Sequence, residues 1–147
     1  MENKINLYEM KFVLDREYSI LEKEDFDFTL KICGSDTLLD LIKAIIDFLE
    51  LREDRNVSVF NLIKNDLVES YHSDIEFIKI WSDDFLSADI SIDTVLKGKT
   101  PEQIFNYNYE DVWLFLIEIK SIESLESYQK PVLLETNGYL NKHEFGR

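Results

Sequence analysis

Three side chains in this sequence have the chemistry of a nucleophile, a base or a zinc ligand: Cys33, His72 and His143. A cysteine nucleophile needs a lowered pKa and a base within hydrogen-bond reach. Cys33 stands just before a predicted helix, whose dipole would lower the pKa of its thiol, but no histidine is near it in the sequence. Zinc sites use cysteines and histidines at short paired spacings, which these three residues lack. The sequence therefore predicts no bound metal and favours a structural role for Cys33.

Two pairs of neighbouring acids, Asp83-Asp84 and Glu110-Asp111, could bind a hard cation or act as general acid and base. No calcium-loop spacing surrounds the first pair, and the second stands at a predicted hairpin turn, where both carboxylates are hydrated. Nucleotide sites need grouped glycines close to phosphate, whereas the four glycines of this chain are isolated. We therefore expect no cofactor, and we find no recognisable catalytic group.

The segment FNYNYED at 105–111 has the chemistry to bind a cationic partner. Its alternation places Tyr107 and Tyr109 on one face of a strand, next to the acids of the turn. Aromatic rings beside carboxylates offer cation–π contacts to Lys or Arg, worth ~0.5–2 kcal/mol each. The candidate binding surface comprises Tyr107, Tyr109, Glu110, Asp111, Asp83 and Asp84. In the alternative, both tyrosines lie in the core and the acids serve solubility.

The overall charge favours the same kind of partner. The chain has 30 acidic and 16 basic residues, which give a net charge of −14. Nucleic-acid-binding proteins need a basic face. The field of this molecule instead repels DNA, RNA and anionic lipid. A cationic protein or peptide is the partner that such a field attracts.

The remaining composition is typical of a cytoplasmic protein with one domain. A chain of 147 residues with 45% hydrophobic side chains can bury a stable core. Cys33 is the only cysteine, so no internal disulfide forms. The start, MENKINLYEM, lacks the apolar core of a signal peptide, and the longest apolar run, VWLFLI at 112–117, is too short to cross a bilayer. We expect a single domain over residues 1–147, located in the cytoplasm.

Hydrophobic periodicity predicts the elements that position these residues. Residues 5–14 and 26–33 alternate apolar and polar side chains, which predicts two half-buried antiparallel strands joined by a long loop. Residues 37–51 have apolar side chains at helical spacing, which predicts an amphipathic helix. Ser35 or Asp36 could cap its first turn.

The second half of the chain adds further strands. We predict strands at 57–63 and 75–81, and a short helix at 91–98. Residues 105–109 and 112–119 read as a hairpin whose second strand is apolar on both faces and therefore covered on both sides. The predicted fold is α+β, with a mixed or antiparallel sheet and the 37–51 helix packed on one face.

Residues 107–115 also resemble a motif of the plasmid pRiA4b ORF-3-like proteins, a strand reading Tyr-Asp-Phe-Gly-Asp-Asp-Trp with a later His. Tyr107, Asp111 and Trp113 match it, and Tyr109 is a conservative match. Looser matches in the family's order are Leu38, Leu41, Phe60, Pro131, Val132, Gly138 and Glu144. The family's histidines are replaced by Ile42, Asn56 and Phe115. The resemblance implies a β-grasp-like α+β fold and no established activity, and without those histidines it implies no metal site.

These observations favour a non-enzymatic protein-interaction module with an acidic surface. The alternative is a small hydrolase-type enzyme or a small-molecule-binding domain, with a site built from the 64–91 loops, the 110–111 turn and the C-terminal tail. A concave pocket that collects Cys33, the two histidines or several acids would favour this alternative. The sequence leaves the oligomeric state open.

Overall fold

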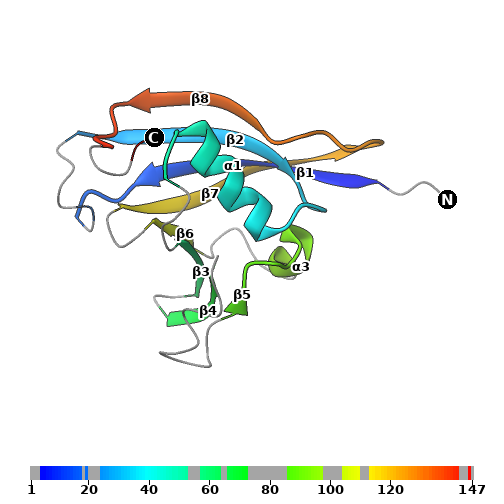
Figure 1. Cartoon of the computed structure of the whole chain (residues 1–147). Coiled ribbons are helices and arrows are strands. Elements are labelled where there is room, and N and C mark those ends of the chain that lie inside the picture. Colours follow the sequence, from blue (N-terminus) through cyan, green and yellow to red (C-terminus); the bar gives the residue numbers. More distant parts are fainter. Residues whose placement is uncertain are drawn as a thin grey trace.

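The computed structural model describes residues 4–17, 19, 24–52, 57–63, 66–72, 86–97, 104–109, 113–142 and 146, and these residues form one eight-stranded sheet (Figure 1). The strands are β1 (Ile5–Leu14), β2 (Phe26–Cys33), β3 (Val57–Ile63), β4 (Asp66–His72), β5 (Leu86–Ser87), β6 (Ile104–Tyr109), β7 (Trp113–Leu125) and β8 (Val132–Gly138), and the helices are α1 (Leu38–Phe48) and α3 (Ile92–Leu96). The strand order is β5-β4-β3-β6-β7-β1-β2-β8. The sheet is mixed, because β4 and β5 are parallel and the other neighbours are antiparallel.

The first two strands confirm the predicted antiparallel pair. β1 and β2 have the predicted bounds and pair from Leu7↔Cys33 to Val13↔Asp27. The apolar side chains predicted to face inward are all buried, and they are Tyr8, Met10, Phe12, Leu14, Phe26, Phe28, Leu30 and Ile32. The period-two pattern therefore identified the core face of both strands.

The main helix is confirmed, with a different cap. α1 spans Leu38–Phe48, and its N-cap is Thr37, whose side chain accepts a hydrogen bond from the Asp40 amide at 3.0 Å. The Asp40 carboxylate accepts in return from the Thr37 amide at 2.9 Å, which completes a capping box. The expectation that Ser35 or Asp36 caps the helix is wrong, because the helix begins one residue too late for Asp36 and two too late for Ser35.

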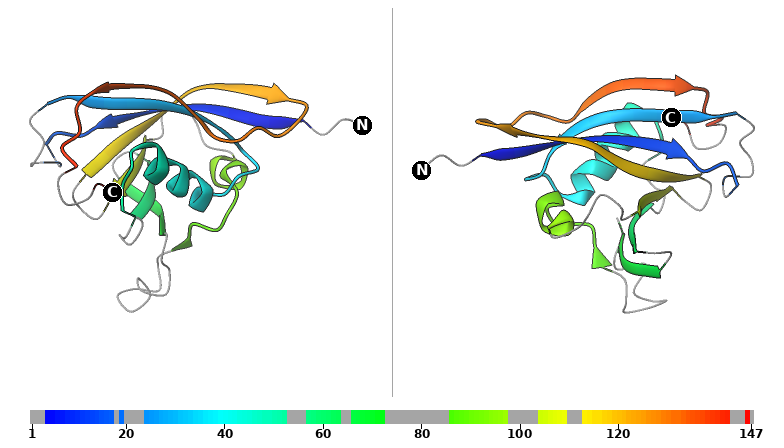
Figure 2. Two further views of the ribbon diagram at one scale, coloured as in Figure 1. Left: turned by 45° about the horizontal axis from the view of Figure 1, so that its top comes forward. Right: turned by 180° about the vertical axis from the view of Figure 1, so that it is seen from behind.

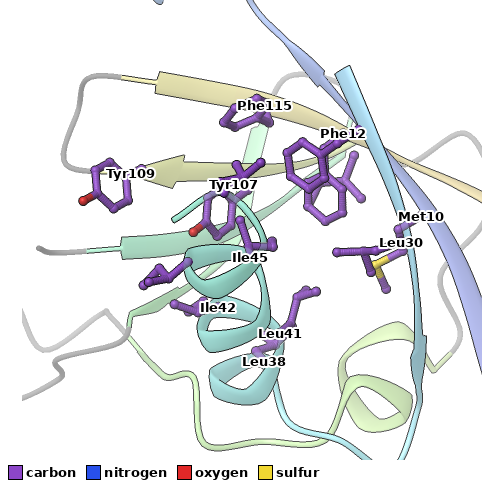
Figure 3. Close-up of a cluster of buried hydrophobic side chains, with 14 of the residues drawn as sticks. Met10, Phe12, Leu30, Leu38, Leu41, Ile42, Ile45, Tyr107, Tyr109 and Phe115 are labelled. Atoms are coloured by element: carbon purple, nitrogen blue, oxygen red, sulfur yellow. The ribbon is translucent and has the colours of Figure 1, made fainter. Parts of the chain in front are cut away.

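The α1 helix lies against one face of the sheet, and the two together enclose the core (Figures 1 and 2). Its buried side chains are Leu38, Leu41, Ile42, Ile45 and Ile46. They meet aromatic rings from four strands (Figure 3). Phe12 stacks on Phe28 with ring centroids 4.6 Å apart, and Phe115 lies edge-on to Phe28 at 5.4 Å. This arrangement confirms the predicted α+β class and the strand–strand–helix–strand order at the start of the chain.

The hairpin of β6 and β7 is also confirmed, but β7 is not covered on both faces. Trp113, Phe115 and Ile117 are buried in the core. The Leu114 amide donates a hydrogen bond to the Ser19 hydroxyl at 3.0 Å, so Ser19 lies beside the beginning of the strand. Leu116 is 39% exposed. The prediction that β7 is covered on both faces is therefore wrong from Leu116 onward.

Several elements differ from the predicted set. The short helix α3 has Ser91 as its N-cap, as expected. Strands β4, β5 and β8 were not predicted, and the strand expected at 75–81 lies outside the described residues. β8 ends at Gly138, where φ is +92° and a Cβ would overlap the Asp25 carbonyl oxygen. Only glycine adopts that conformation at so close an approach without strain, so Gly138 fixes the end of β8 against the start of β2.

Candidate functional site

The structure places the two tyrosines of the predicted binding surface in the core, as the alternative interpretation required. Tyr107 and Tyr109 are both fully buried (Figure 3). Tyr107 lies edge-on to Phe12 at 6.1 Å, and Tyr109 stacks on Trp113 at 5.3 Å. The expectation that these rings are exposed to a partner is therefore wrong, because the sheet face on which they lie is the one covered by α1.

The other members of that surface lie outside the described residues. These are Asp83, Asp84, Glu110 and Asp111. His143 also lies outside them, and only the backbone of His72 is described. A role for these acids in binding stays a prediction. The same is true of the alternative site in the 64–91 loops, the 110–111 turn and the C-terminal tail.

The buried tyrosines differ in one respect that can be measured. The Tyr109 hydroxyl donates to the Arg52 carbonyl oxygen at 2.9 Å, whereas the Tyr107 hydroxyl has no hydrogen-bond partner among the described residues. Burial, and secondarily the charge of Tyr109, raises the pKa of Tyr107 well above its ordinary value. An unpaired buried hydroxyl has lost its hydration without compensation, which costs about 1–3 kcal/mol.

Tyr107→Phe is therefore expected to raise the free energy of unfolding by about 1 kcal/mol, because it removes only the unpaired hydroxyl. Tyr109→Phe is the matched control and is expected to lower the free energy by about 1 kcal/mol, because it leaves the Arg52 carbonyl without its donor. Urea denaturation of both variants and the parent measures the difference. A loss of stability in Tyr107→Phe equal to that in Tyr109→Phe would show that the Tyr107 hydroxyl has a partner.

Cys33 is fully buried at the end of β2. Its thiol lies 3.4 Å from the Gln129 carbonyl oxygen, in the segment between β7 and β8. This contact fixes the segment to the sheet. A structural role for Cys33 fits this position, since a fully buried sulfur presents no surface to a substrate.

A partly buried polar cluster ties α3 to β1. The Asp93 carboxylate accepts from the Tyr8 hydroxyl at 2.7 Å and from the Asn6 amide at 3.0 Å. Burial, followed by the Asp93 carboxylate, raises the pKa of Tyr8. A Cβ on Gly34 would overlap the Asp93 carboxylate, so this glycine lets α3 approach the end of β2. The hydrogen bonds within the cluster give it a structural role.

The described residues enclose one groove with several charged side chains. It has a volume of about 410 Å³ and lies between the exposed side of α1 and the segment that leads into β8. We call it the α1 groove. One wall comprises Asp36 and the α1 residues Asp40, Lys43, Ala44, Asp47 and Phe48. The opposite wall comprises Tyr128, Lys130 and Pro131.

The two walls of the α1 groove are joined by a hydrogen bond between Asp36 and Tyr128. The Tyr128 hydroxyl lies 3.0 Å and 3.2 Å from the two carboxylate oxygens of Asp36. Burial raises the pKa of the Asp36 carboxyl and the nearby Asp40 charge adds to this, while the Tyr128 hydrogen bond opposes both. The ring of Tyr128 stays accessible, since the residue is 52% exposed. The groove therefore offers carboxylates, an exposed aromatic ring and apolar surface at one place.

The sequence does not predict the α1 groove. Asp40, Lys43 and Asp47 lie on the exposed face of α1, as expected for the polar side of an amphipathic helix. Nothing in the sequence shows that Tyr128 and Pro131 lie opposite that face. Their position depends on how β8 pairs with β2, and β8 itself was not predicted.

The described part of the chain lacks two further features. No three His, Cys, Asp or Glu side chains gather there as metal ligands would. The described helices include none with the length and hydrophobicity needed to cross a membrane.

Comparison with known proteins identifies a fold and no activity. No protein-family model matches the sequence, and no curated protein matches it. MM3350 from Methanosarcina mazei Go1, a protein of unknown function with a crystal structure, is similar with a TM-score of 0.67. The alignment covers 91% of this chain and 70% of that chain at 15% sequence identity. At this level of identity the likeness shows that the two proteins share an α+β fold.

Proposed function

We propose that this chain is a non-enzymatic, cytoplasmic binding module that receives a cationic segment of another protein in the α1 groove. The observation that supports this most directly is the combination of Asp36, Asp40 and Asp47 with the exposed ring of Tyr128 around one groove. We also propose that the chain is a divergent member of the pRiA4b ORF-3-like family. The matches at Tyr107, Asp111 and Trp113 support that assignment.

The electrostatics of the molecule favour a cation in this groove. Its walls contain three aspartates and two lysines, on a chain with a net charge of −14. A field of this sign accelerates encounter with basic partners and repels nucleic acid. Lys43 and Lys130 would repel a cation placed beside them, so they restrict where a basic side chain can lie.

The apolar part of the α1 groove suits the aliphatic stem of a lysine or arginine. Phe48 is half-buried, Pro131 stands opposite it, and the Tyr128 ring lies nearby. A cation–π contact contributes ~0.5–2 kcal/mol. An exposed ion pair contributes ~0.2–1 kcal/mol. Together these give about 0.7–3 kcal/mol, which corresponds to a dissociation constant weaker than about 1 mM for one side chain.

The proposal can be tested with a fluorescein-labelled peptide of alternating lysine and valine. The double variant Asp40→Asn, Asp47→Asn is expected to weaken its binding by about tenfold in fluorescence anisotropy, because it removes two carboxylates from the groove. The control Glu17→Gln, Glu118→Gln removes the same charge from exposed sites outside the groove and is expected to have a smaller effect.

Two results would contradict the proposed function. Equal weakening in both double variants would show that only the net charge attracts the peptide. Tight binding of duplex DNA at physiological salt would contradict the electrostatic reasoning itself.

A further inference from the structure

We propose that the cationic partner binds as an extended strand along β8 and extends the sheet by one strand. This inference rests on the proposed function, since it specifies how a segment held at the α1 groove continues. β8 is the last strand in the sheet order and pairs with β2 along one edge only. Figure 1 shows β8 at the margin of the sheet.

The outer edge of β8 is free within the described part of the chain. Its backbone takes part in the ladder with β2, from Lys31↔Val132 to Phe26↔Gly138, and in no other described backbone hydrogen bond. Alternate amide and carbonyl groups of a strand point to each edge. The groups on the outer edge of β8 are therefore available to pair with another chain.

This edge has little protection against such pairing. Strand edges in proteins are usually short, covered, or interrupted by lysine or proline. The opposite margin of the sheet follows this rule, because β5 has only two residues, Leu86–Ser87. β8 has seven residues, VLLETNG, without lysine, arginine or proline, and its Val132 and Leu134 are 42% and 46% exposed. Its protective features are a bulge opposite Thr29 and Leu30 and the charge of Glu135.

The free edge is continuous with the α1 groove. Lys130 and Pro131 line the groove, and Val132 is the first residue of β8. A strand paired with the beginning of β8 therefore lies beside the groove, where one of its basic side chains can reach Asp40 or Asp47. Backbone pairing adds the hydrogen bonds that raise the weak affinity of a single side chain.

Charge favours a basic segment over a second copy of this chain. Two copies would each have a net charge of −14. Antiparallel pairing of β8 with itself about its central residue would also place Glu135 opposite Glu135, and like charges directly opposite each other are destabilising. A basic segment instead has no such repulsion and offers a cation to Glu135.

The test compares two forms of the lysine–valine peptide, one of them N-methylated at alternate residues. N-methylation along one edge removes the amide donors and keeps every charge. If the peptide adds to β8, N-methylation is expected to weaken binding at least about tenfold. Leu134→Lys, at an exposed position, is expected to weaken binding of the unmodified peptide to a similar extent. Thermal unfolding checks that the variant is folded.

Three further outcomes would contradict the proposal in part or in whole. If both peptides bind with equal affinity and the double variant Asp40→Asn, Asp47→Asn still lowers that affinity, the groove binds the partner and strand addition is wrong. If neither peptide binds, the proposed function fails and the strand addition fails with it. If sedimentation shows a dimer of the free protein that Leu134→Lys dissociates, β8 pairs with a second copy and the basic segment is wrong.

Discussion

Phe115→Ala is expected to lower the free energy of unfolding by about 3–5 kcal/mol. Phe115 is fully buried, and its ring lies 5.4 Å from that of Phe28 and 6.2 Å from those of Phe26 and Tyr107. Removing it takes away apolar burial and leaves a cavity that the three neighbouring rings cannot fill without moving. Urea denaturation followed by circular dichroism measures the loss.

Leu116→Ala is the matched control for this prediction. Leu116 is the next residue of β7, points to the opposite face and is 39% exposed. Its truncation is expected to cost below about 1 kcal/mol, because little apolar surface returns to water and no cavity forms. Equal losses in the two variants would mean that the outer face of β7 is covered, against the arrangement described above.

Ile45→Asp is expected to abolish folding or to lower the free energy of unfolding by at least about 5 kcal/mol. Ile45 is fully buried on α1, among the side chains that face the sheet (Figure 3). The variant loses the burial of the isoleucine and places an unpaired carboxylate in the core. A loss of that size equals most of the stability of an ordinary domain, which is about 5–15 kcal/mol.

Two variants separate this effect from the propensity of the helix. Lys43→Asp places the same side chain on the exposed face of α1 and is expected to cost below about 1 kcal/mol. Ile45→Val keeps an apolar side chain and is expected to cost about 0.5–1.5 kcal/mol. Circular dichroism and thermal unfolding measure all three. A folded Ile45→Asp protein with the melting temperature of the parent would mean that α1 buries another face.

The elements that the sequence predicts are those with one exposed and one buried face. β1, β2 and α1 each bury one regular set of side chains and expose the other, so their periodicity is strong. β8 lacks this signal because it is an edge strand whose residues are exposed on both faces, apart from half-buried Leu133. β4, DLVESYH, has a mixed sequence without clear alternation.

Faces and neighbours are harder to predict than elements. Alternation placed Tyr107 and Tyr109 on one strand face, which is correct, but one strand alone does not show whether that face meets α1 or water. The helix cap has the same difficulty, because Asp36 suits an N-cap as well as Thr37 does. In the folded chain Asp36 is bound by Tyr128, a residue far away in the sequence. The α1 groove depends on such distant contacts throughout.

The position of β1 in the sheet has a consequence for the order in which the chain can fold. β1 lies between β2, which follows it closely, and β7, with pairs that extend from Leu14↔Phe115 to Ile5↔Leu125. These partners are separated by roughly a hundred residues, and contacts between such distant segments slow folding because the intervening chain must first be closed into a loop. During synthesis, β1, β2 and α1 emerge early, yet one edge of β1 stays open until β7 has been made. Until then the open edge of β1 can pair with the wrong strand, and an unpaired strand edge of this kind makes a partly folded chain prone to aggregate.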